Sequence, residues 1–523
     1  IIPTMRFSSA FLWASALCLA AVDARSASAV GAPTLAVPRS KAAAPNVKSP
    51  VVDAAIVGRD TPVVSTAAAA TATRGGAAAS DSSKQITGAA YFIIMDIVLR
   101  KLFAKYEIPF PSQLGGCCIL FALMAVSELI RPGFGDAAFD VLSPGAAILA
   151  KWLPVFFVPG LAMLPLAPSM GSPFEAVKVF STVFIGFFFS LFTTTFSVLG
   201  LRKLQGTAVD APVEVAADAA PAAGPAPKAF SDEMMDFMLK GTVLSGAISI
   251  AASKTGQTYK TPLQTIFMGF ATFTSFIWGA RMPAAVTKFL HPILTSTGMT
   301  FLTARLIGVA TGSSFVDVLR EYKCGSLGAL TAGAGDLILY MLGPAVISFA
   351  IAMYSRKGVI ASNLSTVTTG VVMGSAGGLF GTAAFVRALG IGGSDGCMVR
   401  LSTIPRNITT ALAMVIAKLL GGDTSIAAVL CVLTGMFAAM IGAKTLDAWG
   451  VTDPVSRGLG LGAAGQSLGA ASISNEKEAF PFAAVNMVLT AVFATVLASI
   501  PAVSDALIGL SCGSPEPVVS TAA

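Results

Sequence analysis

Charged side chains are scarce in this 523-residue chain: Asp, Glu, Lys and Arg make up 12% of it, against about 25% in an ordinary soluble domain. Hydrophobic residues make up 54%, and the mean hydropathy is +0.78. A soluble protein of this length would need far more charge to cover its surface. The composition therefore predicts a polytopic membrane protein and excludes a cytosolic enzyme. The net charge of +7 does not indicate nucleic-acid binding, because basic loops commonly flank membrane helices.

Histidine is almost missing, since His291 is the only one in the chain. A Ser-His-Asp triad would have to use it, and a metal site with several histidines is excluded. The seven cysteines have no CxxC spacing. The adjacent Cys117 and Cys118 suit packing better than a zinc site or a disulfide. We therefore expect no enzyme activity and no cofactor, and we place His291 at the start of a helix.

The N-terminal segment has the composition of a targeting leader. Residues 1–25 hold a short basic stretch and an apolar run, as in a signal peptide. Residues 26–85 are rich in Ala, Ser, Thr, Pro and Val and carry more basic than acidic residues, which predicts a disordered, transit-like region. Such a two-part leader is typical of plastids acquired by secondary endosymbiosis. The alternative is simple secretion with a disordered ectodomain.

The rest of the chain divides into two membrane blocks. Apolar stretches of about 20 residues, the length that spans a bilayer, occur in residues 86–201 and again in 234–511. Residues 202–233 between them are rich in Ala and Pro and have no span, so we expect a linker. Residues 512–523 form a tail. The pattern predicts an all-α polytopic membrane protein with about twelve transmembrane helices.

Two segments of the second block resemble each other. Residues 344–353 (PAVISFAIAM) and 405–414 (PRNITTALAM) share Pro, Ile, Ala, Ala and Met at matching positions. Proline interrupts a helix, and matching interruptions in two halves point to a transporter site between inverted repeats of broken helices. A half-helix that begins within the membrane presents unpaired N–H groups to an anion. The alternative is a chance likeness between two kinked helices of biased composition.

An arginine beside the second interruption strengthens this prediction. Arg406 at membrane depth would cost about 2.5–3.5 kcal/mol and should face a cavity or a partner. Its planar guanidinium fits a carboxylate. The neighbouring polar groups suit a hydroxy acid; they are Ser348, Asn407, Thr409 and Thr410. The alternative places Arg406 at the membrane interface, with its side chain extended to the lipid headgroups.

A glycine-rich polar stretch, residues 452–469, is the third unusual feature. Its glycines permit either close helix packing or a broken helix. It lacks the lysine of a phosphate-binding loop. The polar side chains expected to line such a break are Gln466 and Ser467. The charged residues considered for a proton or charge relay are Asp336, Asp453 and Arg457, although Asp453 and Arg457 have the spacing of a local ion pair.

Both blocks resemble known membrane protein families. The first is similar to the LrgA/CidA-type holin-like family at residues 109–115 (PFPSQLG) and 153–160 (LPVFFVPG). The second is similar to the LrgB/CidB-type family in four motifs. These are residues 342–345 (LGPA), 404–409 (IPRNIT), 433–435 (LTG) and 453–458 (DPVSRG). A fusion of the two behind a plastid leader resembles a family of plastidal translocators.

The resemblance implies a carrier in the plastid inner envelope that exports glycolate and imports glycerate in photorespiration. The second block would carry the substrate, and the first would be a scaffold or dimerisation domain, so we expect a homodimer in contact with membrane lipids. Both acids are small 2-hydroxy carboxylates, in agreement with the arginine and hydroxyls above.

This chain departs from the family at one position. The family has a histidine where this chain has Gln466, in residues 466–470 (QSLGA), and glutamine does not titrate near neutral pH. Two other functions stay open: a holin-like pore or regulator of envelope integrity, and a carrier of pyruvate or another short monocarboxylate.

Overall fold

The computed structural model describes residues 77–513 except 109, 168–171, 210–229, 255–259, 288–289, 329 and 392–395. Every regular element in these residues is a helix, which confirms the predicted all-α class. The signal-like segment 1–25 and the last ten residues lie outside the described part of the chain, and so does most of the transit-like segment. The first described helix begins at Ala77, within the predicted bounds of that segment, in an alanine-rich run that favours helix.

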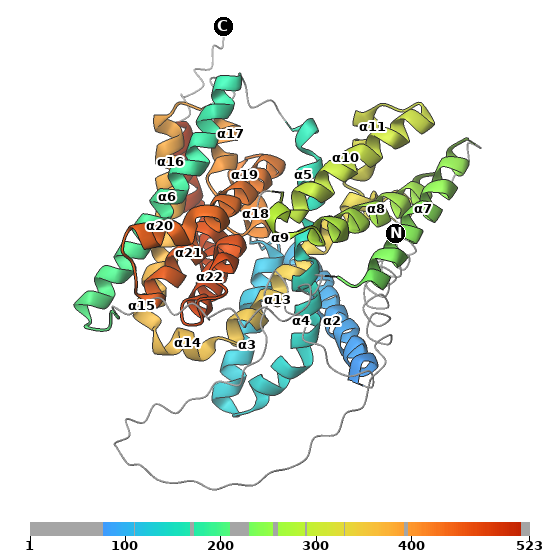
Figure 1. Ribbon diagram of the computed structural model, residues 1–523. Helices are drawn as coiled ribbons and strands as arrows, with labels where there is room; N and C mark the ends of the chain where they lie inside the picture. The colour runs from blue at the N-terminus through green and yellow to red at the C-terminus, as the bar shows by residue number, and fades with distance from the viewer. Residues whose placement is uncertain are drawn as a thin grey trace.

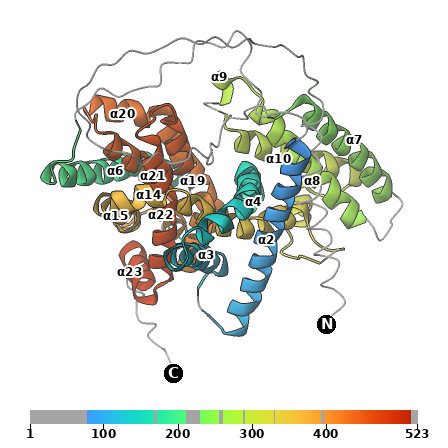
Figure 2. The ribbon, with the colours of Figure 1, turned by 90° about the horizontal axis from the view of Figure 1, so that it is seen from below.

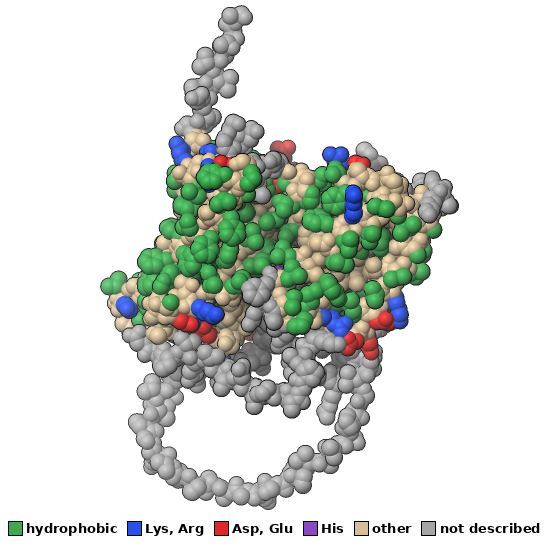
Figure 3. Space-filling model, turned by 45° about the horizontal axis from the view of Figure 1, so that its top comes forward, with side chains coloured by type: hydrophobic (Ala, Val, Ile, Leu, Met, Phe, Trp, Pro, Cys, Tyr) green, Lys and Arg blue, Asp and Glu red, His purple; other side chains and the backbone are tan. Residues whose placement is uncertain are grey.

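Nine spans in the described residues are long and apolar enough to cross a membrane, so the chain is polytopic. We predicted about twelve spans from the ~20-residue rule. Three further long helices, α2 (Ala77–Lys105), α8 (Lys260–Ala280) and α21 (Pro454–Ser472), fall outside those nine. Figure 3 shows hydrophobic side chains over the middle of one face, with most charged side chains near its upper and lower edges. This is the distribution expected of a protein that lies in a bilayer.

The helices form three groups, which Figures 1 and 2 show from two directions. In the first, α2 packs with α3 (Ser112–Ile130), α4 (Phe134–Phe156) and α13 (Leu342–Tyr354). The second consists of α7 (Asp232–Lys254), α8, α10 (Pro292–Thr311) and α11 (Phe315–Tyr322). Short connecting helices are α5 (Val158–Ala162), η1 (Leu164–Leu166), α9 (Ala284–Thr287), α12 (Ala334–Tyr340) and α14 (Lys357–Ser362).

The third group holds the motifs singled out in the sequence. It contains α15 (Leu364–Val372), η2 (Met373–Gly377), α16 (Gly378–Ala388), α17 (Gly396–Thr403), α18 (Thr410–Leu420), α19 (Thr424–Phe437), η4 (Ala438–Gly442), α20 (Ala443–Ala448), α21, α22 (Phe480–Ser499) and α23 (Pro501–Cys512). One helix of the first block, α6 (Pro173–Leu204), also lies in this group, along α21 (Figure 1). The sequence did not predict that a helix of the first block would be built into the second.

Two helices of the third group are broken. Residues 404–409 separate α17 from α18, so the interruption predicted at Pro405 is present. Within α21, Gln466 has φ 50° and ψ −140°, which divides that helix. The predicted interruption at Pro344 is much weaker, because α12 and α13 continue each other as one apolar span, Ala334–Tyr354. Pro344 lies in the first turn of α13, where proline is tolerated.

The order of elements supports an internal repeat in the second block. A short helix and a longer one, α12 and α13, precede a 25-residue span that contains the π-helical turn η2. The same order recurs in α17 and α18 before a second 25-residue span, which contains the π-helical turn η4. The inverted relation between the two halves stays a prediction.

A disulfide that the sequence did not predict joins Cys397 of α17 to Cys512 at the end of α23. Arg387 and Arg400 donate to backbone carbonyls in the last turn of α23, so the C-terminal helix is also held by hydrogen bonds. Cys117 is buried and unpaired, as expected of a packing residue, and Cys118 is unpaired and half-buried.

Candidate functional site

Arg406 lies between the two broken helices, and its side chain is only 1% exposed. It belongs to the break between α17 and α18, and its Nη2 atom donates to the carbonyl of Gly186 at 2.7 Å and to the hydroxyl of Ser190 at 3.2 Å. Its Nε and Nη1 atoms have no hydrogen-bond partner among the described residues. The snorkelling alternative is therefore wrong, because the guanidinium is enclosed by protein. A buried cation with unpaired donors is suited to receive an anion.

The close approach of Arg406 to α6 depends on a glycine. A Cβ atom placed on Gly186 would lie 2.3 Å from Cζ of Arg406, so the guanidinium packs directly on the helix backbone. Ser190 follows one turn later on the same face of α6. Both residues lie in an apolar, phenylalanine-rich stretch of the first block, and sequence reasoning missed them. The available signal was a single glycine followed four residues later by a serine in that stretch.

Asn407 connects the break to two neighbouring helices. Its Nδ2 atom donates to the carbonyls of Gly374 in η2, at 2.9 Å, and Ala463 in α21, at 3.1 Å. These two bonds fix the orientation of the amide, since only the nitrogen can donate. The Oδ1 atom is buried and has no partner within the described part of the chain. Asn407, which follows Arg406 in the chain, thus has one buried acceptor without a partner among the described residues.

The second break lies beside the first. Nε2 of Gln466 donates to the carbonyl of Cys431 at 2.6 Å, and the Cys431 thiol donates to the carbonyl of Ile408. Cys431 of α19 therefore bridges the two interruptions. A positive φ in a residue other than glycine is costly and is found mainly at functional sites. Gln466 fills a structural position at which one broken helix contacts the other.

The glycines of α21 permit close packing, as the sequence predicted. A Cβ atom on Gly458 would lie 2.2 Å from the backbone oxygen of Ala479, just before α22, and one on Gly462 would lie 2.4 Å from that of Ala483 within α22. One on Gly460 would lie 2.0 Å from the hydroxyl of Thr195 in α6. Both predicted consequences of the glycine run, close packing and a broken helix, are therefore present.

The remaining predicted site residues differ in their positions. Thr409 is the N-cap residue of α18 and Thr410 begins that helix, and both are buried. Ser467 follows the break in α21 and is half-buried. Ser348 is buried in α13, which packs on α2, α3 and α4, and its hydroxyl donates to the carbonyl of Ala345. No hydrogen bond among the described residues joins Ser348 to the group around Arg406.

Asp453 and Arg457 do not pair with each other. Asp453 is the N-cap residue of α21 and forms a buried ion pair with Arg202 of α6 at 3.0 Å. Arg457 forms two hydrogen bonds with the carboxylate of Glu476, at 2.7 and 2.9 Å, and a third with Asp447. The local pair is absent because the helix start directs Asp453 towards its own N–H groups and towards α6. As placed, both residues fasten α21 to its neighbours.

Asp336 is buried at the first turn of α12. Its carboxylate accepts from the backbone N–H groups of Cys324, Gly325 and Gly333 at 2.9, 2.9 and 3.2 Å. This arrangement orders the turn before α12, and a role in a proton or charge relay stays a prediction.

His291 is the N-cap residue of α10, which confirms its predicted position at a helix start. Its Nδ1 atom accepts from the N–H of Ile293 at 3.3 Å. Burial lowers the pKa of His291 to about 4, so the imidazole is neutral near pH 7 and available as an acceptor.

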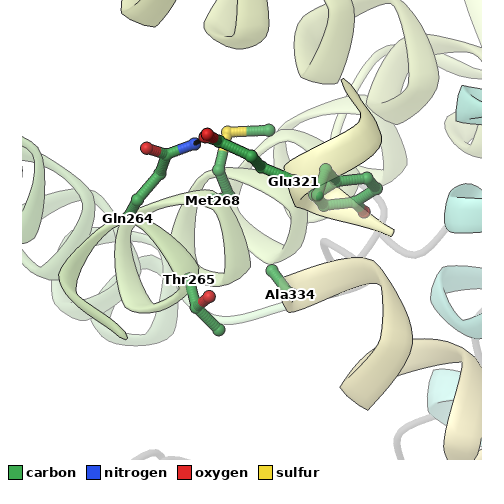
Figure 4. A pocket seen from close by; sticks show the side chains of 6 residues that line it. Gln264, Thr265, Met268, Glu321 and Ala334 are labelled. Atoms are coloured by element: carbon green, nitrogen blue, oxygen red, sulfur yellow. Dashed lines mark hydrogen bonds between the residues drawn. The ribbon is translucent and has the colours of Figure 1, made fainter. Parts of the chain in front are cut away.

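Two hollows lie away from this group. The one in Figure 4 is about 10 Å³, enough for one water, and Gln264 donates to Glu321 beside it at 2.7 Å. The other, about 180 Å³, lies between η1, α6 and α19 and is lined wholly by apolar side chains. The first is too small for a carboxylate, and the second offers no polar partner. Arg406 is the candidate site on a different ground, because it is a buried cation with donors that are unpaired among the described residues.

Comparison with known proteins bears out the resemblance seen in the sequence. Residues 272–503 match the LrgB-like family. The chain is 29% identical over 418 residues to plastidal glycolate/glycerate translocator 1, chloroplastic, of Arabidopsis thaliana, an alignment that covers 79% of this chain and 78% of that protein. The similarity extends well beyond the LrgB-like region, while the LrgA-type resemblance of the first block stays a prediction. No solved structure matches the chain significantly.

Proposed function

We propose that this chain, whose residues 272–503 match the LrgB-like family, is a secondary transporter of small 2-hydroxy carboxylates in a plastid membrane. The substrate carboxylate would bind Arg406 at the junction of the two broken helices. Glycolate leaving the plastid and glycerate returning is the specific exchange that we propose, since the Arabidopsis relative is named for these two acids. We further propose the inner envelope of a secondary plastid as the location, reached through the two-part leader.

One observation carries the proposal: Arg406 is 1% exposed, and two of its three guanidinium nitrogens have no partner among the described residues. An uncompensated buried cation strongly destabilises its surroundings. A bound carboxylate would supply the missing charge and acceptors. The N-terminus of α18, which begins at Thr410 four residues after Arg406, has no side-chain cap among the described residues, and a helix N-terminus favours an anion.

The enclosure of Arg406 favours a carrier over a pore. A permanent pore would expose its charged lining to water, whereas this guanidinium is sealed between α6 and the break at residues 404–409. A carrier passes through such a closed state while it moves its substrate between the two sides of the membrane. Loading the site then requires α6 to move relative to the broken helices.

Counterflow tests the proposal. The full chain is reconstituted in liposomes preloaded with unlabelled glycerate, and the uptake of labelled glycolate is followed. We expect saturable uptake that needs the internal hydroxy acid. Leak of glycolate regardless of loading would indicate the holin-like pore. Absence of glycolate flux, with uptake of pyruvate, would indicate a carrier for another monocarboxylate.

Arg406→Lys tests the assigned residue. Lysine keeps the charge but loses the planar group, so we expect the apparent affinity for glycolate to fall about tenfold or more. Arg320→Lys is the matched control, because Arg320 is 68% exposed and pairs only loosely with Asp317 at 3.8 Å. Unchanged affinity in the Arg406→Lys variant would show that Arg406 does not bind the substrate carboxylate.

A further inference from the structure

The helix that the first block contributes, α6, carries two threonines whose hydroxyls are not used by the protein. Thr194 and Thr195 are both 0% exposed, and neither Oγ1 atom has a partner within the described residues. Threonine in a helix usually donates to the carbonyl one turn earlier. Thr182 and Thr193 of the same helix do so, at 3.0 and 2.7 Å. Two neighbouring buried hydroxyls therefore depart from the pattern of their own helix.

The position of these hydroxyls relative to Arg406 follows from the helix repeat. Gly186 and Ser190 contact Arg406, and Thr194 is four residues further on, on the same face of α6. Thr195 faces α21 at Gly460, where a Cβ atom would lie 2.0 Å from its hydroxyl. Ala463, three residues after Gly460, accepts from Asn407. Thr194 thus lies one helical turn along α6 from Ser190, which contacts Arg406, and Thr195 lies beside α21 about one turn from Ala463, which contacts Asn407.

The direction of α6 agrees with this placement. Arg202, after the threonines, pairs with Asp453, before Gly460, so α6 and α21 run antiparallel. Ser190, before the threonines, therefore lies towards the Gln466 break. The unpaired groups of α6 and of residues 406–407 consequently line one stretch of the contact between α6 and α21.

The unpaired atoms divide into two chemical kinds. Arg406 offers N–H donors, which suit a carboxylate. Oδ1 of Asn407 can only accept, and a carboxylate has no hydrogen to give it. A hydroxyl group both donates and accepts, so it can donate to Asn407 while it accepts from a threonine. A carboxylate with a hydroxyl on the adjacent carbon matches both kinds at once.

We propose that Thr194 and Thr195 of α6, together with Oδ1 of Asn407, form the subsite for the 2-hydroxyl of the substrate and so set the specificity of the carrier. This rests on the proposed function, in which Arg406 holds the carboxylate. The first block is then more than a scaffold, because its last helix binds the 2-hydroxyl group, which a simple carboxylic acid lacks. A site built to bind a hydroxyl discriminates against an analogue without it, because its polar groups are left unpaired.

Competition by acetate, which is glycolate without its hydroxyl, tests the inference. Uptake of labelled glycolate by the full chain in liposomes is inhibited with unlabelled glycolate or acetate, and the ratio of the two half-inhibitory concentrations is the selectivity. We expect the natural chain to favour glycolate at least tenfold. Thr194→Val and Thr195→Val each remove a hydroxyl at nearly constant volume. Each should lower that selectivity severalfold, mainly because the binding of glycolate becomes weaker.

The controls separate specificity from folding. Thr193→Val removes a hydroxyl that is bonded to its own helix, and Thr194→Ser keeps the hydroxyl, so both should retain the natural selectivity. An unchanged ratio in both valine variants would overturn the inference, and so would a natural chain inhibited equally by acetate and glycolate. These outcomes leave carboxylate transport intact, whereas failure of the proposed function would abolish saturable uptake of every carboxylate.

Discussion

At the scale of single residues, the candidate site depends on a cation that the protein only partly compensates. Arg406 has one nitrogen bonded to α6 and two without partners among the described residues. Asp453 and Arg457, in contrast, are buried charges whose partners are all protein groups. This difference separates a group available for a ligand from groups that fasten helices, and it could not be seen in the sequence.

Gly186→Ala should weaken substrate binding without altering any charge. The added Cβ would lie 2.3 Å from Cζ of Arg406, so the guanidinium must move away from α6. We expect the apparent KM for glycolate to rise about tenfold, since a hydrogen bond to a charged group contributes about 1.5–3 kcal/mol. Gly200→Ala is the control on the same helix, because nothing lies within 4 Å of its added Cβ. Equal KM values for the two variants would contradict the placement of Arg406.

His291 should make the protein less stable in mild acid. Its pKa is about 4 in the folded chain and about 6.5 when unfolded, so the unfolded chain binds the extra proton between these values. The contribution of His291 to the free energy of unfolding is therefore complete above about pH 6.5 and is lost as the pH falls towards 4. Melting temperatures in detergent at pH 7 and pH 5 measure the loss. His291→Asn keeps a good N-cap and should reduce that loss; an identical pH dependence in the variant would rule out His291 as a cause.

At the scale of elements, the broken helices are held together by few contacts. Cys431 bridges the break at residues 404–409 and the break at Gln466. The disulfide between Cys397 and Cys512 ties α17, which leads into the first break, to α23. The C-terminal helix therefore supports the element that carries Arg406.

Loss of the disulfide should destabilise the third group of helices. The bridge closes a loop across a sequence separation of 115 residues, and such a cross-link contributes about 2–5 kcal/mol. We expect Cys512→Ser to lower the apparent melting temperature by several degrees. Cys324→Ser, which replaces a thiol outside any disulfide and keeps a donor for Thr331 and Asp336, should have little effect. A Cys512→Ser variant as stable as the natural chain would show that the bridge is not a support.

At the scale of the whole molecule, the two sequence blocks do not correspond to two separate halves. Helices α2, α3 and α4 of the first block pack on α13 of the second, while α6 packs along α21. The ion pair between Arg202 and Asp453 lies at one end of the contact between α6 and α21. The third group of helices is therefore assembled from both blocks.

The second block by itself should not transport. A chain of residues 230–523 lacks Gly186, Ser190 and the rest of α6, so Arg406 would lose its partners. We expect no saturable glycolate uptake from this chain in liposomes, and recovery of uptake when residues 1–229 are co-expressed as a separate chain. Uptake by residues 230–523 alone, with the KM of the full chain, would show that α6 is dispensable.

The sequence by itself determined the class of the protein and the position of the first break. Scarce charge and repeated apolar stretches leave only a polytopic helical fold, because too few polar side chains exist to cover a soluble surface. Pro405 and the glycines of α21 mark interruptions because their effects on a helix are local. Arg406 stood out because an arginine in such a stretch needs a partner.

Only the tertiary structure decided what meets Arg406. Gly186 and Ser190 lie more than 200 residues away in the chain, in a helix that by pattern is an ordinary apolar span. The same holds for the pairing of Asp453 with Arg202 in place of Arg457. Local pattern correctly marked the break at Pro405, although not one at Pro344, whereas the partner of a buried polar group depends on which helices pack together. Which helices pack together depends on the complementary shape of whole helix surfaces, such as the glycine-lined face of α21 that contacts Thr195.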